Sequence, residues 1–422
     1  MSVDQSRWLM RCRRAGIFSV FALFLVFFNF GCHKRPVSRA TPQMDAAEKF
    51  WIRVLVGRGY SKCELSMESA FVIRWDGGKT SKRFEIRSGV VSAAVVGGRL
   101  KVAGEIFDGG EVVVVPESPH IFEFNGVKYR GRSKLLVDEG GASFSVINEV
   151  PLKPYLGGVV GAEMPSYWEP AALEAQAIAA RTYCLYIKRR FGVNRSWDVR
   201  KNESSQVYTG LSGECGAVWS AVNGTSGQVL YCEDGSGHEG LFPTYYSSAC
   251  GGHTENSKHV FGDSFKSLVG VECDYCRRVA KPRIFFWPMV CIDKSEVSRR
   301  LVERYPSLGQ LGRIVEIVTH GESRYKHFSR LTSIKLVGEK GGSSFVRAED
   351  FRLSVDPSGR RLRSTVWEMV DLGKQWGFLS GRGYGHGVGM CQCGAEGMAR
   401  AGKTAKEILR YYYPGSKIMN VY

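Results

Sequence analysis

Acidic residues are few relative to basic ones in this chain of 422 residues, which has 41 Asp and Glu against 58 Lys and Arg and a formal net charge of +17. Such a balance favours anionic partners, including nucleic acids, anionic lipids and acidic polymers such as carboxylate-bearing glycans. The sequence has no zinc-finger array, no RNA-binding strand motif and no Lys/Arg block of the nucleic-acid-binding kind. We therefore expect no nucleic-acid partner. Repeats and low-complexity tracts are absent as well.

Two nucleotide-binding signatures are also missing. The glycine-dense run at 381–389 lacks the strand-then-helix context and the downstream acid of a dinucleotide fingerprint, and it lacks the Gly-Lys-Ser/Thr of a phosphate loop. Alternating glycines instead let the backbone approach a bulky ligand or a neighbouring strand. His386, inside this run, either lines a cleft or is a structural histidine in a crowded turn. We expect no organic cofactor.

The N-terminus predicts export. Four arginines between positions 7 and 14 precede the uncharged, apolar run 15–31, a pattern typical of a signal peptide. Cys32 follows a glycine, as at the site where bacterial lipoproteins are cut and lipidated, whereas the run is also marginally long enough to remain as a membrane anchor. Either alternative makes 1–32 a signal or anchor and 33–50 a tether, with the rest on the extracytoplasmic side.

The remaining chain is expected to be an α+β protein with more than one domain. Short β-branched runs separated by glycine pairs predict a β-rich N-terminal module at 51–149. A mixed α/β catalytic domain is expected in two parts, 150–280 and 346–422, with an inserted subdomain at 281–345. The clearest helix begins at Pro170, because proline suits a first helical position and apolar residues then recur at helical spacing.

One carboxylate, Glu163, lies among small and apolar neighbours in the turn expected to enter this helix. An acid in such surroundings loses hydration, which raises its pKa and lets it hold a proton near neutral pH. That is the condition for a general acid. A firmly packed helix directly after it would hold the side chain still, so we predict that Glu163 is catalytic.

The cysteines allow two interpretations. Twelve cysteines in an exported protein would normally suggest disulfides. However, Cys250 with His253 and Cys273 with Cys276 form two short pairs separated by a loop, a spacing that matches a tetrahedral zinc site. We predict a structural Zn²⁺ on these four residues; disulfides among the same cysteines, or a histidine that is merely hydrogen-bonded, are the alternatives. Three thiolates would leave no open position for catalysis at the metal.

Four ordered blocks of the sequence carry a resemblance. They are YLGGVVGAEMPSYWEPAALEAQAIAARTY at 155–183, QVYTG at 206–210, TYYSSACGGHTEN at 244–256 and GRGYGHGVGMCQCGAEGMARAGKTAKEILRYYYPG at 381–415. They resemble the stage II sporulation protein D family (SpoIID/LytB, the amidase-enhancer family) over about 150–275 and 345–420. The family usually reads closer to Met-Ser-Gln-Tyr-Gly after the glycine run, where this chain has Met-Cys-Gln-Cys-Gly. The resemblance implies a catalytic core of the SpoIID type.

The resemblance also implies a function. Enzymatic members are peptidoglycan lytic transglycosylases, lyases that cleave the MurNAc–GlcNAc bond, prefer denuded glycan strands and leave 1,6-anhydroMurNAc ends. Their catalytic Glu, in Ala-Glu-Met-Pro, matches Glu163. One carboxylate suffices because the sugar's own C6 hydroxyl is an intramolecular nucleophile. A role in cell-wall remodelling, division or a sporulation-like process would follow. The alternatives are a non-catalytic cell-wall binder that enhances an amidase, and a basic envelope protein held together by disulfides.

Residues inside the matching blocks are predicted to bind the glycan. Aromatic faces suit sugar rings, and guanidinium groups suit the free lactyl carboxylates of peptide-free strands. The predicted substrate-binding residues are Arg181, Gln206, Tyr208, Tyr245, Ser247, Arg382, His386 and Gln392. Arg181 has a purely structural alternative, since it lies on the predicted helix. The expected partners are peptidoglycan strands, a peptidoglycan amidase, and the membrane through the N-terminal anchor or lipid.

Overall fold

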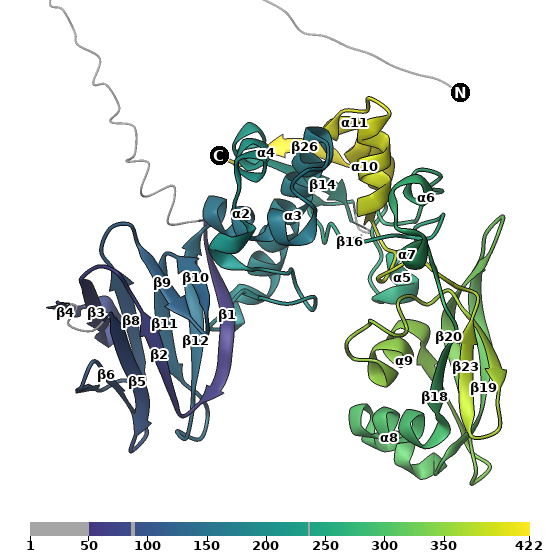
Figure 1. Ribbon diagram of the computed structural model, residues 1–422, viewed down its shortest axis with the longest axis horizontal. Helices are drawn as coiled ribbons and strands as arrows, with labels where there is room; N and C mark the ends of the chain where they lie inside the picture. The colour runs from purple at the N-terminus through teal and green to yellow at the C-terminus, as the bar shows by residue number, and fades with distance from the viewer. Residues whose placement is uncertain (1–49, 86–88, 235–236) are drawn as a thin grey trace, which may run out of the picture. The chain divides into compact units, whose positions relative to one another are not determined.

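The computed structural model describes residues 50–85, 89–234 and 237–422 (Figure 1). The predicted signal or anchor at 1–32 and the tether up to residue 49 lie outside the described residues. Within the described ranges, no helix combines the length and the apolar character needed to cross a membrane. Strands and helices are both abundant, which confirms the α+β fold class.

The first described part is a β module, as the alternating pattern predicts. Its strands are β1 Trp51–Tyr60, β2 Lys62–Ser66, β3 Phe71–Trp75, β4 Thr80–Phe84, β5 Val90–Val96, β6 Arg99–Val102, β7 Glu105–Phe107, β8 Glu111–Pro116, β9 Ile121–Phe124, β10 Val127–Arg130, β11 Arg132–Val137 and β12 Phe144–Pro151, with β13 Val199–Arg200 added later in the chain. One sheet has the order β13-β1-β12-β11-β8-β3-β4 and the other β10-β9-β2-β5-β6-β7. Alternate side chains enter a shared core, as Val112 and Val114 of β8 do.

A helical layer follows, built around one long helix. The helices are α2 Leu152–Glu163, α3 Pro170–Phe191, α4 Gly216–Gly224, α10 Gln392–Arg400 and α11 Ala405–Tyr412. Pro170 occupies the first turn of α3, as predicted. The buried alanines of α3 have little bulk, so α2, α4, α10 and α11 all pack against this helix (Figure 1).

Short elements join segments that are far apart in the sequence. They are η2 Gly192–Asn194, η3 Gly210–Gly213, β14 Gln228–Glu233, β15 Glu239–Leu241, β16 Tyr246–Ser247, α5 Ser257–Val260, α6 Cys276–Val279, α7 Pro282–Phe285, β25 Met390–Cys391 and β26 Lys417–Asn420. Strand β16 has only two residues. These pair in parallel with β25, Tyr246 opposite Met390 and Ser247 opposite Cys391.

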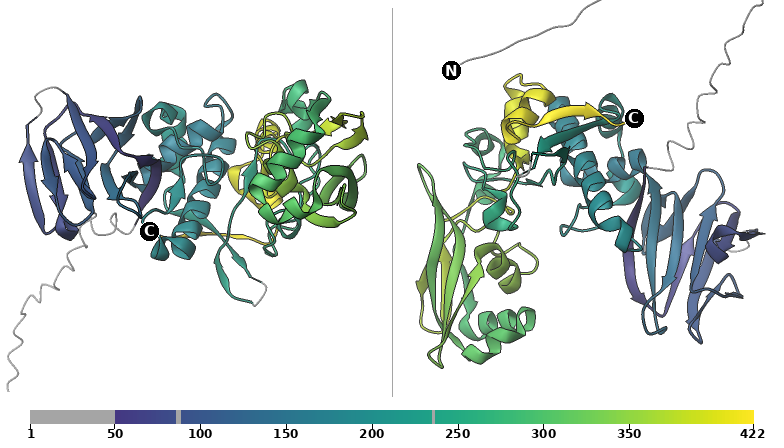
Figure 2. Two further views of the ribbon diagram at one scale, coloured as in Figure 1. Left: turned by 90° about the horizontal axis from the view of Figure 1, so that it is seen from below. Right: turned by 180° about the vertical axis from the view of Figure 1, so that it is seen from behind.

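A second hydrophobic core is built from residues between Trp287 and Phe378. Its elements are β17 Phe286–Trp287, β18 Val290–Asp293, α8 Lys294–Arg304, η4 Pro306–Leu311, β19 Ile314–Arg324, β20 Ser329–Gly338, β21 Ser343–Arg347, α9 Ala348–Val355, β22 Glu368–Asp371, β23 Gln375–Leu379 and β24 Gly381–Arg382. Helices α8 and α9 contact each other and the β19–β20–β21 sheet, and both views of Figure 2 show these elements together. Helix α8 is amphipathic and buries Val297 and Leu301.

Candidate functional site

Glu163 is the last residue of helix α2, so the expectation that it lies in a turn entering α3 is wrong. The glycines of α2 lower its intrinsic helix propensity, which conceals this helix in the sequence. Packing requires them, because a Cβ on Gly161 would overlap the carbonyl oxygen of Gly213 in η3. The close approach of α2 to η3 therefore fixes the position of Glu163.

The carboxyl group of Glu163 meets hydrogen-bond donors from three separate segments. The N–H of Val207 donates to Oε1 at 2.8 Å, and the hydroxyl of Tyr246 lies 3.5 Å from the same oxygen. The side chain of Gln392 forms a third hydrogen bond. Burial outweighs these three bonds and raises the pKa of Glu163 to about 7. The residue as a whole is partly exposed, and its carboxyl group holds a proton near neutral pH.

Buried glutamines hold the groups around Glu163 in place. Gln206 accepts a hydrogen bond from Tyr155 at 2.8 Å and donates to the hydroxyl of Tyr246 at 2.9 Å. Gln392 donates to the side chain of Gln176 on α3 at 3.4 Å. Gln206 and Gln392, both predicted to bind substrate, therefore act here by orienting the immediate neighbours of the acid.

Glu163 has no carboxylate partner in the described part of the chain, as judged by its hydrogen bonds and ion pairs. The exposed acid Glu203 has the smallest effect among the groups that shift its pKa. Ordinary glycosidases place two carboxyl groups on either side of the scissile bond. This site instead offers one carboxyl group for proton transfer.

Two predicted substrate-binding residues are structural, which corrects the sequence analysis. Arg181 is fully buried and donates to the carbonyl oxygens of Val222 and Gln228 at 3.1 and 3.0 Å, so it joins α3 to α4 and β14. Tyr208 is also buried, and its hydroxyl donates to Asn148 at 2.9 Å. Neither group is available to a saccharide, because tertiary packing encloses both side chains.

Three further predicted residues lie in or near the β16–β25 pair. Tyr245 donates to Asp263 at 2.7 Å, and Ser247 is buried within β16. Nδ1 of His386 accepts from the N–H of Val388 at 3.0 Å. Burial lowers the pKa of His386 to about 4, so its ring is neutral at neutral pH. Tyr245 and His386 thus have partners within the protein, and substrate contact by all three residues stays a prediction.

Four buried thiols form a compact cluster. The sulfur atoms of Cys250, Cys273, Cys276 and Cys391 all lie within 4.8 Å of one another, and the Cys250–Cys276 separation is 3.7 Å. None of the cysteines in the described ranges forms a disulfide. The parallel pairing of β16 with β25 brings Cys391 to the other three, although it is more than a hundred residues away in sequence.

His253 is not part of this cluster, so its prediction as a metal ligand is wrong. Gly251 and Gly252 both have positive φ angles, of 81° and 122°, and turn the chain directly after Cys250. The ring of His253 stacks on Tyr325, with centroids 3.9 Å apart, and its Nδ1 lies 2.6 Å from the carbonyl oxygen of Thr254. The fourth member of the cluster is Cys391 instead.

The donor set fits a tetrahedral zinc ion. Zinc–sulfur bonds of about 2.3 Å place sulfur atoms about 3.8 Å apart, near the 3.7 Å observed for one pair. The N–H of Cys250 donates to Sγ of Cys391 at 3.2 Å, and the Tyr412 hydroxyl lies 3.1 Å from Sγ of Cys273. Such contacts orient metal ligands. A Cβ on Gly394 would lie 2.7 Å from Sγ of Cys273, so glycine is needed there.

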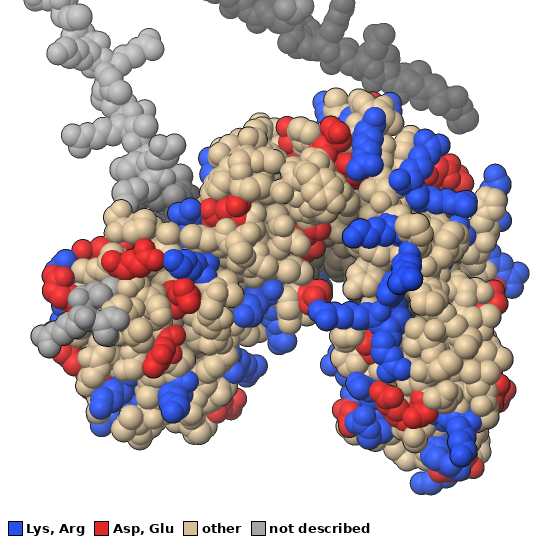
Figure 3. All heavy atoms as spheres, viewed as in Figure 1, with Lys and Arg blue, Asp and Glu red and all other residues tan. Residues whose placement is uncertain are grey.

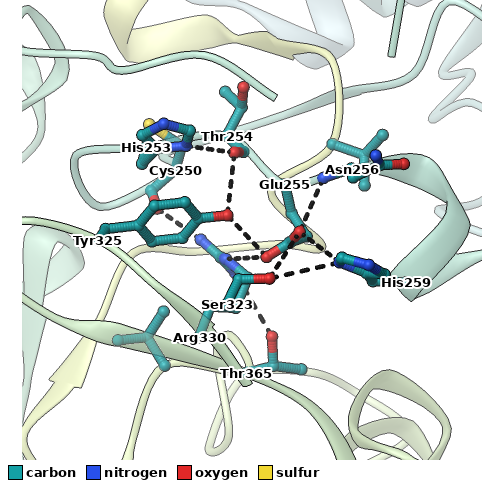
Figure 4. A network of polar contacts seen from close by, with 12 residues as sticks. Cys250, His253, Thr254, Glu255, Asn256, His259, Ser323, Tyr325, Arg330 and Thr365 are labelled. Carbon is teal, nitrogen blue, oxygen red and sulfur yellow. Dashed lines mark hydrogen bonds and ion pairs between the residues drawn. The ribbon is translucent and has the colours of Figure 1, made fainter. Parts of the chain in front are cut away.

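A buried polar network holds the loop that carries Cys250 (Figure 4). Arg330 donates to the carbonyl oxygen of Cys250 at 2.6 Å, and its Nε lies 4.0 Å from Oε2 of Glu255. Tyr325 donates to the same carboxylate at 2.8 Å. Because Arg330 and Tyr325 belong to the β19–β20 hairpin, the network attaches the loop to the second core.

The same network contains Ser323, His259 and Glu255, but their geometry excludes a catalytic triad. Ser323 Oγ and Glu255 Oε1 both contact Nδ1 of His259, at 3.3 and 3.0 Å. A triad needs the nucleophile and the orienting acid on opposite nitrogens of the ring. These three residues are therefore a structural cluster.

Arg382, predicted to bind substrate, lies beside the cysteine-bearing loop. A Cβ on Gly251 would be 3.0 Å from its Cγ, and within the described ranges Arg382 makes no hydrogen bond or ion pair with Glu163. Its guanidinium lies over the rings of Phe285, Phe286 and Phe328.

Sequence reasoning missed four residues that complete these sites: Val207, Tyr246, Gln176 and Cys391. Neighbouring strand residues point to opposite faces, so a strand here allows either Tyr245 or Tyr246, but not both, to face Glu163. The departure from the family pattern at Cys391 was visible in the sequence. Its part in the cluster was not, because no short spacing connects it to the other cysteines.

Comparisons with known proteins give consistent similarities. A family model described as Stage II sporulation protein matches residues 140–231. The chain is 31% identical over 307 residues to an uncharacterized protein of Brachyspira hyodysenteriae, covering 73% of this chain and 76% of that protein. It is 26% identical over 290 residues to Stage II sporulation protein D of Bacillus subtilis, covering 64% and 75%. It is 27% identical over 303 residues to the Amidase enhancer of the same organism, covering 62% and 40%.

Proposed function

The chain belongs to the stage II sporulation protein D (SpoIID) family, whose function concerns the cell wall, and we propose that it is a peptidoglycan lytic transglycosylase. The observation that carries this proposal is a single carboxyl group, that of the partly exposed residue Glu163, with a pKa of about 7 and no carboxylate partner in the described ranges. A reaction that needs one residue first as acid and then as base suits such a group.

In the proposed reaction Glu163 transfers its proton to the glycosidic oxygen between MurNAc and GlcNAc as the bond from that oxygen to C1 breaks. The C6 hydroxyl oxygen of the same MurNAc then attacks C1, and its proton passes to the Glu163 carboxylate. The products are a free GlcNAc hydroxyl and a 1,6-anhydroMurNAc end, so atoms and charge balance. The donors Val207, Tyr246 and Gln392 stabilise the carboxylate between the two steps.

The proposed substrate is a glycan strand without stem peptides. Removal of the peptide leaves a free lactyl carboxylate on each MurNAc, so the polymer is anionic. A chain with a formal net charge of +17 attracts such a polymer. We also propose that residues from about 33 onward act outside the cytoplasm, with 1–32 as signal, lipidation site or anchor.

The first prediction concerns pH. Glu163 must be protonated in the free enzyme, so kcat/KM should be constant at lower pH and fall tenfold per unit above about pH 7. The neighbouring Tyr155, Tyr183 and Tyr246 stay neutral there, because burial raises the pKa of each. Initial rates of anhydro-product release, measured across pH 5–9 (about four units), would show this fall in kcat/KM. If kcat/KM instead began to fall near pH 4.5, the ordinary pKa of a glutamate, Glu163 would not be the acid.

The second prediction uses two adjacent tyrosines. Tyr246→Phe removes a donor to the Glu163 carboxylate, so the pKa of Glu163 should rise. The fall in kcat/KM should then occur at higher pH. A shift of about half a unit is expected, because a long hydrogen bond is worth less than ~1 kcal/mol. Tyr245→Phe is the matched control, because the Tyr245 hydroxyl donates to Asp263. This variant should leave the pH at which kcat/KM falls unchanged. Equal shifts in the two variants would refute the specific role of Tyr246.

We further propose that Cys250, Cys273, Cys276 and Cys391 hold one structural zinc ion. The support is the separation of their sulfur atoms and the absence of disulfides among the described cysteines. Zinc, when bound, would supply a cross-link and no reactive position, because four thiolates complete its tetrahedron. Cys391 directly precedes Gln392, and β16 pairs with β25, so a rigid cluster would also fix two of the groups that bond Glu163.

A second candidate function is supported by the similarity to a protein named Amidase enhancer. In that alternative the chain binds cell-wall glycan without cleaving it and stimulates a peptidoglycan amidase. The two functions differ in one measurable respect: the enhancer releases no anhydro product in any form, and substitution of Glu163 leaves its stimulation of the amidase unchanged.

A further inference from the structure

A cavity of about 130 Å³ lies beside the cysteine cluster. Its walls come from the Gly252–His253 loop, from helix α6 and the end of α7, and from the turn between β19 and β20. The side chains that matter for its chemistry are Arg277, Phe285, Tyr325, Lys326, Phe328 and Arg382. Figure 3 shows Lys and Arg side chains gathered on the surface over α6 and α7.

Arg382 is the unusual residue of this cavity. Its guanidinium makes no hydrogen bond or ion pair within the described ranges, and its Nε is buried without a partner. Three aromatic rings surround it, with centroids 5.1, 5.2 and 4.7 Å away at Phe285, Phe286 and Phe328. Aromatic rings stabilise the positive charge. Unlike a carboxylate, however, they do not accept hydrogen bonds from the N–H groups of the guanidinium. The guanidinium is thus held in place with its hydrogen-bonding capacity unused.

The opposite wall is rigid. Tyr325 stacks on His253 with an interplanar angle of 15°, and its hydroxyl donates to the buried Glu255 (Figure 4). Arg330 ties the same loop to β20 through the carbonyl oxygen of Cys250. A preformed cavity loses little conformational entropy when a ligand binds.

We propose that this cavity is a carboxylate-binding subsite in which Arg382 is the principal contact, with Arg277 and Lys326 adding positive charge. A planar guanidinium binds a planar carboxylate through two parallel hydrogen bonds. Glu272 and Asp274 also line the cavity and are exposed, so they oppose a dianion such as phosphate more than a single carboxylate. The subsite therefore selects groups of charge −1.

The nature of the ligand rests on the proposed function. In cell-wall material a carboxylate has two sources, the lactyl group of a denuded MurNAc and the stem peptide of an intact one. The competing explanation for Arg382 is that its charge offsets that of nearby thiolates, since burial lowers its pKa most and Cys276 and Cys250 raise it. An Arg with that role would be needed for metal retention and not for ligand binding.

The test is a binding measurement by calorimetry in the Glu163→Gln background, where no cleavage removes the ligand. The probes are denuded glycan, the same glycan with its lactyl carboxylates reduced to alcohols, free stem peptide, and inorganic phosphate. Arg382→Gln should weaken binding of denuded glycan at least ~10-fold and leave the reduced glycan unaffected. Lys326→Gln, on an exposed side chain, should weaken it about threefold. Arg278→Gln, an equal charge change on α6 outside the cavity, should have no effect.

Each outcome is decisive. Equal affinity of the parent and of Arg382→Gln for both denuded glycan and stem peptide overturns the subsite, and so does loss of bound zinc from Arg382→Gln. Phosphate binding that depends on Arg382 overturns the selectivity for a single charge. Arg382-dependent binding of stem peptide but not of denuded glycan assigns the carboxylate to the peptide. Release of anhydro product by the unsubstituted chain is measured separately, so failure of the catalytic proposal is distinguishable from failure of this one.

Discussion

Glu163→Gln is expected to lower the release of 1,6-anhydromuramyl product from denuded glycan by about 10²–10⁴-fold. The amide has the shape of the acid, but it has no proton to transfer to the glycosidic oxygen and cannot accept one from the C6 hydroxyl. The fold should be retained, because the carboxylate makes no ion pair in the described ranges and its burial already disfavours the charged form. Mass spectrometry of the products from a defined glycan measures the effect.

Glu203→Gln is the matched control for this variant. It removes the same charge from an exposed acid that has the weakest influence on Glu163, so its rate should stay within about twofold of the parent. Substantial anhydro product from Glu163→Gln would remove the mechanism. If neither the parent nor the variant releases product, while both stimulate an amidase equally, the enhancer function is correct.

Cys391→Ser is expected to release the bound zinc, whereas His253→Ala should retain about one metal ion per chain. The reason is geometric: Cys391 lies within the cluster of four sulfur atoms, and His253 stacks on Tyr325 outside it. The loss of stability should be large, since zinc binding contributes about 10–16 kcal/mol in zinc-finger peptides. Metal analysis and thermal unfolding with and without a chelator are the measurements.

Cys291→Ser controls for the removal of a thiol, because Cys291 is free, partly exposed and outside the cluster. Its metal content should equal that of the parent. If His253→Ala lost the metal and Cys391→Ser retained it, the ligand set predicted from sequence, with His253 in place of Cys391, would be correct. Oxidised thiols without any metal in the purified protein would favour the disulfide alternative instead.

Features that depend on neighbouring residues were predictable without the structure. Helix α3 begins at Pro170 because a proline in the first turn loses no hydrogen bond, and this effect acts within one turn. The small and apolar residues next to Glu163 in the chain predict a raised pKa, and burial in the folded protein raises it to about 7. Strand alternation gave the β module, since side chains of a strand face opposite sides. The family resemblance belongs to the same level, because ordered blocks of local sequence carry it.

Which distant residues meet depends on packing and strand pairing in the folded protein. Register between β16 and β25 selects Tyr246 rather than Tyr245 to face Glu163, and a shift of one residue would exchange them. The same pairing brings Cys391 to the cluster in place of His253. Packing against η3 made α2 a helix despite its glycines, and burial turned Arg181 from a candidate anion partner into a structural link. These outcomes depend on contacts between segments far apart in the chain. The conformational preferences of neighbouring residues do not predict such contacts.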